Sequence, residues 1–167
     1  MKNSLNKSQI ERFSRQLVLK NIGPKGQKKI ISSKILIVGI GGLGCPAAEN
    51  LTRAGIGTIG LVDNDIINLS NIHRQSLFNS KDVKKLKVRV AAKKLKEINP
   101  LTRIVTYKSR LNEKNIENII KNYELIIDGS DNFETKFLIN DYCIKFKKKL
   151  ITGAISKFDG HICAFNF

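Results

Sequence analysis

The stretch Lys34-Ile-Leu-Ile-Val-Gly-Ile-Gly-Gly-Leu-Gly44 joins a short apolar run to a glycine-rich turn. A nearly continuous apolar run of this length is typical of a strand buried on both faces of a parallel sheet. The glycines fit the pattern G-x-G-x-x-G, and a helix is expected over residues 46–54, with Pro46 in its first turn and Gly55 after its end. Strand, glycine turn and helix in this order predict the first unit of a doubly wound α/β fold.

Outward from this stretch, apolar runs and helical patterns alternate along the chain. We expect strands at 34–38, 58–62, 103–108, 125–127 and 150–152, and helices at 85–98, 112–121 and 133–146. Asp159-Gly160 separates two short runs and indicates a hairpin. Ser8 and Glu11 form a capping-box pattern for a helix that starts near Gln9, and Gly23-Pro24 predicts a loop over 21–26. The expected fold is one α/β domain over residues 1–167: a Rossmann-like, mainly parallel sheet with an N-terminal helix and a C-terminal antiparallel hairpin.

The glycine loop is expected to bind phosphate groups. Gly39 permits the tight turn, Gly41 lets the backbone approach a phosphate, and Gly44 permits close packing of helix on strand. Free N–H groups at the start of the helix attract anions. Asp63 ends the second strand, 19 positions beyond Gly44, where a ligand of a ribose hydroxyl belongs. To this point a nicotinamide-dependent dehydrogenase fits equally well.

The residues after Asp63 favour nucleotidyl transfer over hydride transfer. A polar connection carries Asn71 and Arg74, and Lys87 follows at the edge of the apolar stripe of its helix. Geometry alone favours a Lys87 side chain that snorkels to solvent. The fourth strand ends in Asp128-Gly-Ser-Asp-Asn132, and ligands of doubly wound folds lie beyond such strand ends. Acids and several cations near one phosphate cluster suit the departure of pyrophosphate.

Five motifs of this chain resemble a known family. They are Arg12-Phe-Ser-Arg-Gln16, Val38-Gly-Ile-Gly-Gly-Leu-Gly-Cys45, Leu61-Val-Asp-Asn-Asp65, Leu69-Ser-Asn-Ile-His-Arg-Gln75 and Asp128-Gly-Ser-Asp-Asn132. In this order, from about Glu11 to Phe167, they are similar to the motifs of the ThiF/MoeB/HesA adenylyltransferases. These are bacterial relatives of ubiquitin-activating enzymes.

The resemblance implies ATP and Mg²⁺ as ligands and assigns roles to single residues. Asp63 would hold the ribose, and Asp131 would hold Mg²⁺. Arg15, expected to point away from the core face of its own helix, would reach the phosphates of the other subunit of a homodimer. The implied catalytic residues are Arg15, Arg74, Lys87 and Asp131, and the implied nucleotide site is Gly39, Gly41, Gly42, Gly44, Asp63, Asp65, Asn71, Arg74, Lys87, Asp131 and Asn132.

The reaction implied by the resemblance is the adenylation of a ubiquitin-fold sulfur carrier of the thiamine or molybdopterin type. The carboxylate of its Gly-Gly tail would attack the α-phosphorus of ATP and release pyrophosphate. A carboxylate is already ionised at neutral pH, so no general base is required, and His73 is expected to be a packing or loop residue. The alternative is a non-catalytic module for nucleotide or partner binding, left by loss of a C-terminal part.

Composition sets the remaining expectations. Many longer members of the family carry two CxxC zinc-binding pairs, whereas Cys45, Cys143 and Cys163 form none, so no zinc site is expected in this chain. We expect buried thiols and a domain that is C-terminally truncated relative to the family, either as a fragment of a longer protein or as a shortened member. No apolar run approaches the ~20 residues that span a bilayer, and the N-terminus lacks a signal-peptide pattern, so a cytoplasmic protein is expected. The net charge of +16 comes mostly from dispersed lysines, which favours solvated helix faces over nucleic-acid binding.

Overall fold

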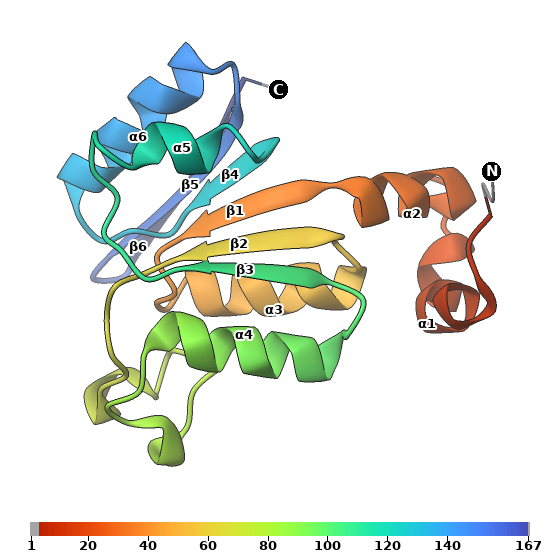
Figure 1. Ribbon diagram of the computed structural model, residues 1–167, viewed down its shortest axis with the longest axis horizontal. Coiled ribbons are helices and arrows are strands. Elements are labelled where there is room, and N and C mark those ends of the chain that lie inside the picture. The colour runs from red at the N-terminus through yellow and green to blue at the C-terminus, as the bar shows by residue number, and fades with distance from the viewer. Residues whose placement is uncertain (1–3, 167) are drawn as a thin grey trace.

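Six strands form one twisted sheet in the computed structural model, which describes residues 4–166. The strand order is β3-β2-β1-β4-β5-β6, and every neighbouring pair is parallel except the antiparallel pair β5–β6 (Figure 1). The strands are β1 (Lys34–Val38), β2 (Thr58–Val62), β3 (Arg103–Tyr107), β4 (Leu125–Asp128), β5 (Lys149–Ser156) and β6 (Asp159–Phe165). The expected doubly wound, mainly parallel sheet with a terminal hairpin is therefore confirmed.

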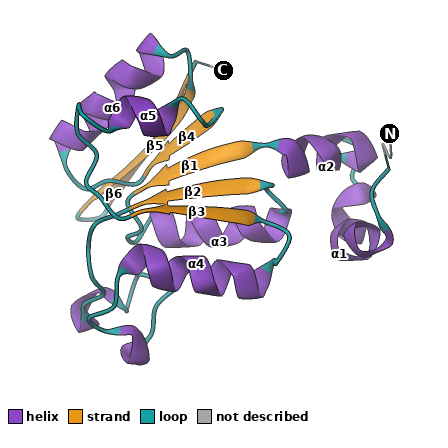
Figure 2. Ribbon diagram, in the orientation of Figure 1, coloured by secondary structure: helices purple, strands orange, loops and turns teal. Residues whose placement is uncertain are grey.

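Helices cover both faces of the central strands. In Figures 1 and 2, α3 (Gly44–Ala54) and α4 (Lys87–Ile98) lie on one face, and α5 (Ile116–Ile120) and α6 (Phe133–Lys145) on the other. Two further helices, α1 (Lys7–Leu17) and α2 (Gly23–Ser32), lie beyond the N-terminal end of β1. Right-handed crossovers between parallel strands place helices on both faces in this way.

The core consists of two clusters separated by the sheet. Ile35 and Ile37 of β1 belong to the cluster beneath α3 and α4. Leu36 and Val38 belong to the cluster beneath α5 and α6. Because successive strand residues point to opposite faces, a strand covered on both sides needs apolar residues at consecutive positions. Burial on both faces therefore explains the nearly continuous apolar run of residues 34–38.

The hairpin turn lies two residues earlier than predicted. Lys157 and Phe158 form the turn, and Asp159 pairs with Ser156 at the start of β6. Lys157 has φ 55°, a left-handed conformation that usually favours glycine, asparagine or aspartate. Asp159-Gly160, predicted as the turn, belongs instead to the ladder.

Two predictions about the N-terminal region were wrong in detail. The capping box of α1 consists of Asn6 and Gln9 rather than Ser8 and Glu11, with reciprocal hydrogen bonds of 2.9 and 3.0 Å. The loop predicted over 21–26 is interrupted at Gly23, where α2 begins with Pro24 in its first turn. Proline is compatible with a first turn because its missing N–H has no helical partner there.

Two helices begin later than predicted. A turn formed by asparagine side chains delays α5: Lys114 N–H donates to the Asn112 side chain, and Asn112 N–H donates to the Asn115 side chain. Such local bonds compete with helix formation. The start of α4 is delayed because Leu86 pairs with Ile66 in a short antiparallel bridge.

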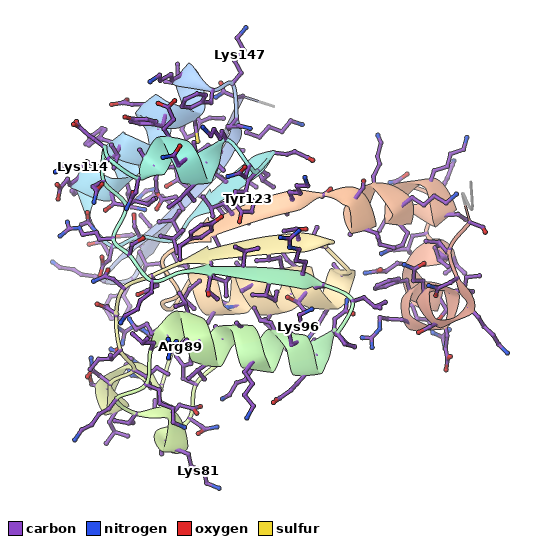
Figure 3. All side chains as sticks on the ribbon, in the orientation of Figure 1. Lys81, Arg89, Lys96, Lys114, Tyr123 and Lys147 are labelled. Atoms are coloured by element: carbon purple, nitrogen blue, oxygen red, sulfur yellow. The ribbon has the colours of Figure 1, made fainter. Side chains whose placement is uncertain are left out.

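Most lysine side chains lie on the surface of the molecule. Lys81, Lys114 and Lys147 point outward in Figure 3, and Lys96 is also exposed, whereas Tyr123 lies inside, under α5. This distribution agrees with the interpretation of the charge as solvated helix faces. Among the described residues, none of the helices combines the length and apolar character that crossing a membrane requires.

Candidate functional site

The glycine loop lies at the point where the order of the sheet reverses. β1 pairs with β2 on one side and with β4 on the other, so the loops after β1 and β4 leave the same edge of the sheet side by side. Gly39 has φ +83°, and a Cβ there would lie 2.9 Å from the carbonyl oxygen of Gly129. A Cβ on Gly44 would overlap the Gly39 carbonyl oxygen. In doubly wound folds this switch point is where ligands bind.

Asp63 holds the glycine loop through its carboxylate. The backbone N–H of Ile40 donates to Asp63 Oδ2 at 2.8 Å, and the N–H of Asp65 donates to Oδ1 at 2.8 Å. The side chain is half-buried at the end of β2. A carboxylate can accept about four hydrogen bonds, so Asp63 retains acceptor capacity for a ligand. Asp63 therefore lies beside the glycine loop, as its spacing from that loop in the sequence predicts.

The connection after β2 folds back over the glycine loop. A 3-10 turn, Leu69–Asn71, ends in the half-buried Asn71, whose carbonyl oxygen accepts from the N–H of Gln75 at 3.1 Å. The exposed Arg74 then lies over Gly42, with its Cδ 3.4 Å from the position of a Cβ on that glycine. Its guanidinium is 3.4 Å from the carbonyl oxygen of Ser70. A cation is therefore positioned at the loop where phosphates are expected.

Lys87 is buried and ion-paired rather than snorkelling. Only 7% of its side chain is exposed, and its Nζ lies 3.0 Å from Oδ2 of Asp65, whose side chain is 63% exposed. The backbone N–H of Lys87 also donates to the Asp65 carbonyl oxygen at 3.0 Å. The expectation of a solvent-directed ammonium was wrong because Asp65, distant in sequence, supplies the counter-charge. This pair fixes the start of α4 beside Asp63.

The end of β4 and the loop that follows it carry two carboxylates, Asp128 and Asp131, that differ in exposure. Asp131 is exposed. Asn132 caps α6, where its Oδ1 accepts from the N–H of Thr135 at 2.9 Å, and its Nδ2 lies 3.4 Å from Asp131. Asp128 is buried and fully hydrogen-bonded within the protein. Only Asp131 is therefore available to a ligand from this pair of acids.

A single exposed carboxylate, Asp131, is compatible with binding of Mg²⁺. Within residues 4–166, groups of three or more His, Cys, Asp or Glu side chains able to hold a metal ion are absent. Mg²⁺ does not require such a cage, since it usually binds one or two carboxylates together with substrate phosphates and water. An exposed carboxylate near a phosphate-binding loop fits that mode.

Arg15 lies far from the other predicted site residues. It is exposed on α1, at the end of the molecule opposite the loops that follow β1 and β4 (Figure 1). The expectation that it points away from the core is confirmed by its exposure. One chain therefore cannot bring Arg15 to its own glycine loop in this arrangement.

Sequence reasoning missed Gln75 as a neighbour of the loop. Its side chain is 3% exposed, and its Nε2 is 3.9 Å from the position of a Cβ on Gly41. Its Oε1 is buried without a hydrogen-bond partner. The position directly after Arg74 in the polar connection was the available signal.

The thiols are not placed for nucleophilic chemistry at this loop. Burial raises the pKa of Cys45 to about 11, and its Sγ lies 3.6 Å from the Ile40 carbonyl oxygen. Burial likewise raises the pKa of Cys143 to about 12. Cys163 is exposed on β6, so the expectation of three buried thiols was wrong for that residue. The exposed His73 is a loop residue 3.4 Å from Arg74, as expected.

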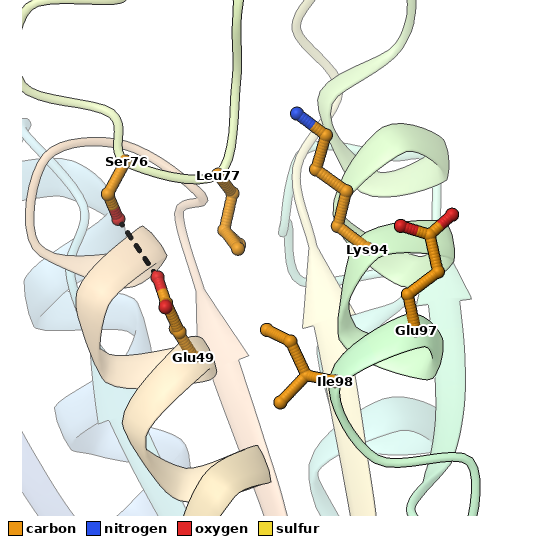
Figure 4. Close-up of a pocket in the computed structure, with 6 residues that line it drawn as sticks. All are labelled: Glu49, Ser76, Leu77, Lys94, Glu97 and Ile98. Atoms are coloured by element: carbon orange, nitrogen blue, oxygen red, sulfur yellow. Dashed lines mark hydrogen bonds between the residues drawn. The ribbon is translucent and has the colours of Figure 1, made fainter.

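A hollow of about 360 Å³ lies between α3 and α4, close to the connection that joins β2 to α4 (Figure 4). Ser76, which follows the Arg74–Gln75 pair, donates to Glu49 at 3.5 Å within it. The hollow contains none of the predicted site residues and therefore lies beside the candidate site. Its lining residues are Glu49, Ser76, Leu77, Lys94, Glu97 and Ile98.

Comparisons with known proteins point to one family. The model of the ThiF family matches residues 13–166. A sulfur carrier protein adenylyltransferase from Thermus thermophilus is 41% identical over 160 residues, which cover 96% of this chain and 59% of that protein. A probable molybdopterin-synthase adenylyltransferase from Gracilaria tenuistipitata is 43% identical, with 98% of this chain and 46% of that protein covered. The chain thus spans about half the length of these relatives.

A solved structure has a closely similar fold. The Escherichia coli tRNA N6-threonylcarbamoyladenosine dehydratase TcdA, in complex with ATP, superposes with a TM-score of 0.86 at 30% identity. The match covers 92% of this chain and 64% of that chain. The likeness extends to a protein whose structure holds ATP.

Proposed function

The chain belongs to the ThiF family, and from this premise we propose that it adenylates the terminal Gly-Gly carboxylate of a ubiquitin-fold sulfur carrier. One observation carries the proposal. Loops distant in sequence, after β1, β2 and β4, converge at the switch point of the sheet and bring a glycine loop, a cation and a free carboxylate together. Relatives named as adenylyltransferases for sulfur-carrier and molybdopterin-synthase proteins support the same reaction class.

In the proposed site, ATP lies across the edge of the sheet. The ribose binds Asp63, and the phosphates face the glycine loop, with Gly41 and Gly42 nearest to them. Asn71, Arg74 and Lys87 contact the triphosphate, so Lys87 exchanges or shares its Asp65 partner when nucleotide binds. Gly39, Gly44, Asp65 and Asn132 shape the site.

The proposed reaction needs no protein base. A carboxylate oxygen of the carrier attacks the α-phosphorus, a new P–O bond forms, the bond to the bridging oxygen of the β-phosphate breaks, and pyrophosphate leaves with the electron pair. Arg74 and Lys87 counter the charge that develops, and the loop fixes the line of attack. Asp131 would hold Mg²⁺, which supplies further charge neutralisation on the phosphates when bound.

Arg15 completes the site from a second copy of the chain in this proposal. Its place at the far end of the molecule is the supporting observation, since a residue there can serve a glycine loop only across an interface. A cytoplasmic homodimer in which each copy lends Arg15 to its partner follows as part of the proposal.

The test is ATP–pyrophosphate exchange with Mg²⁺, with and without a ubiquitin-fold carrier ending in Gly-Gly. We expect exchange that depends on the carrier and is lost when the carrier's last glycine is removed. ATP binding without exchange would contradict the proposal and leave a non-catalytic nucleotide-binding module.

Two inactive variants test the shared site. Arg15→Ala and Asp131→Ala should each lose at least about a hundredfold in exchange, by analogy with removal of other groups that stabilise transition-state charge. Mixing them should restore exchange, because a mixed dimer contains one intact site. Lys7→Ala, which removes another exposed cation of α1, serves as the control. Full activity of the Arg15 variant would exclude the intersubunit role.

A further inference from the structure

The Asp128 carboxylate is the centre of a buried hydrogen-bond network behind the glycine loop. Only 1% of the Asp128 side chain is exposed, although this residue lies at the carboxyl end of the inner strand β4. Oδ1 accepts from the backbone N–H and the hydroxyl of Ser130 at 2.9 and 2.6 Å. Oδ2 accepts from Thr152 Oγ1 at 2.6 Å and from Lys136 Nζ at 3.0 Å. All the acceptor capacity of this acid is therefore used inside the protein.

Lys136 supplies the charge that this carboxylate needs. Its side chain is 18% exposed and extends from the first turn of α6 toward the sheet. Its Nζ also donates to the carbonyl oxygen of Gly153 at 2.8 Å. The ammonium thus joins α6, β4 and β5 at one point. Removing one partner of such a pair leaves an uncompensated buried charge.

The pair lies directly behind the proposed phosphate site. Gly129, the residue after Asp128, contacts the glycine loop: a Cβ on it would be 3.3 Å from the backbone nitrogen of Gly44 and 3.5 Å from the Gly39 carbonyl oxygen. The nitrogen of Gly44 belongs to the first turn of α3, where anions are attracted. A lone carboxylate at position 128 would oppose that attraction.

We propose that Lys136 is a positioning residue for nucleotide binding that acts through Asp128. It neutralises the buried carboxylate and fixes the loop 128–132 against the glycine loop, so that a polyphosphate is held there without repulsion. The inference rests on the proposed function in one respect, that the ligand of the glycine loop is a nucleotide polyphosphate.

A purely structural role of Lys136 and the proposed electrostatic role predict different changes in nucleotide affinity. If Lys136 only braces the loop, its loss weakens all adenine nucleotides by the same factor. If it cancels the Asp128 charge, the loss grows with the number of phosphates and shrinks as salt is added.

The experiment measures the affinities of the full chain for ATP, ADP and AMP without Mg²⁺, at low and high salt. Lys136→Met should weaken ATP binding by about tenfold and AMP binding by about twofold, as expected for one uncompensated charge near the phosphates. Lys136→Arg should restore wild-type affinities. Asp128→Asn leaves the ammonium unpaired and should shift the ATP-to-AMP preference the opposite way. The double variant Asp128→Asn/Lys136→Met should return it toward wild type.

Lys145→Met is the matched control, since it removes an exposed lysine from the same helix. Equal penalties for all three nucleotides in the Lys136 variant would overturn the inference and leave the proposed function standing. A wild-type chain that does not bind ATP would overturn both. If Lys136→Met does not fold, an unchanged ATP-to-AMP preference in Asp128→Asn would overturn the inference.

Discussion

The strands β1 and β2 differ sharply from the hairpin β5–β6, although all four belong to one sheet. Four of the five residues of each inner strand are buried, whereas every residue of β6 is exposed. The parallel strands are joined by crossover helices that cover both faces, and the hairpin connects its strands without a helix. Connection type therefore decides how much of the sheet the described chain buries.

The two regions also differ in how they contribute to the candidate site. The inner strands hold the glycine loop and Asp63 in place, because their ends carry the residues of the switch point. The hairpin contributes Thr152 and Gly153 to the network around Asp128, but its outer part contacts none of the site residues by a described hydrogen bond. Mutations in the two regions should therefore differ in both size and kind of effect.

The largest expected contrast is in thiol reactivity at pH 8. Cys45 and Cys143 are buried with pKa values raised to about 11 and about 12, so they stay protonated and react only when the protein opens. Cys163 on β6 is exposed. With a global stability of at least about 5 kcal/mol, Cys163 should react at least about a thousandfold faster. Labelling with a chromogenic disulfide should show one fast thiol, and three fast thiols would contradict a closed interior.

Core deletions give the next contrast. Leu36→Ala in β1 should lower the free energy of unfolding by about 4 kcal/mol, because Leu36 is fully buried and the substitution leaves a cavity. Ile162→Ala in β6 should change it by less than about 0.5 kcal/mol, since that side chain is 79% exposed. Urea unfolding measures both. Similar losses would mean that the hairpin is covered in solution.

Glycine substitutions sharpen the comparison at the backbone. Gly44→Ala should cost about 3 kcal/mol and weaken ATP binding, because its Cβ would overlap the Gly39 carbonyl oxygen and displace the loop. Gly160→Ala is the matched control in the hairpin, where the nearest atom to an added Cβ is 4.0 Å away. Thermal unfolding and nucleotide titration report the two effects separately. Wild-type ATP affinity in Gly44→Ala would exclude the close packing as a requirement.

The smallest expected effect is a gain of stability in the hairpin turn. Lys157 has φ 55°, which costs a residue with a Cβ about 1 kcal/mol. Lys157→Gly removes that cost but adds entropy to the unfolded chain, so the net gain should be about 0.5 kcal/mol. Hydrogen exchange of β6 amides should slow. Faster exchange would show that the lysine side chain supports the turn.

The sequence predicted best where one segment determines its own structure. The bounds of β1 and β2 agree with the apolar runs, and the glycine spacing identified the loop at the switch point. α2 was missed because Gly23-Pro24 resembles a break. Gly23 does turn the chain, with φ 53°, but Pro24 fits the first turn of the helix that follows.

The candidate site was least predictable where partners are distant in sequence. Lys87 pairs with Asp65, 22 positions earlier, and Thr152 binds Asp128, 24 positions earlier. Local sequence periodicity contains no information on such distant pairs. The ammonium group of Lys87 was therefore expected to reach solvent, although it is buried. Gln75 was overlooked for the same reason, since only the folded connection brings it to Gly41.

The exposed edge strand β6 has a consequence for how solutions of this chain behave. An unpaired edge invites strand pairing between molecules, and exposed apolar side chains such as Ile162 in β6 and Phe158 in the turn before it favour such pairing. The net charge of +16 opposes close approach of two copies. Colloidal stability is therefore a balance between edge attraction and charge repulsion, and added salt, which screens the repulsion, should shift the balance toward association.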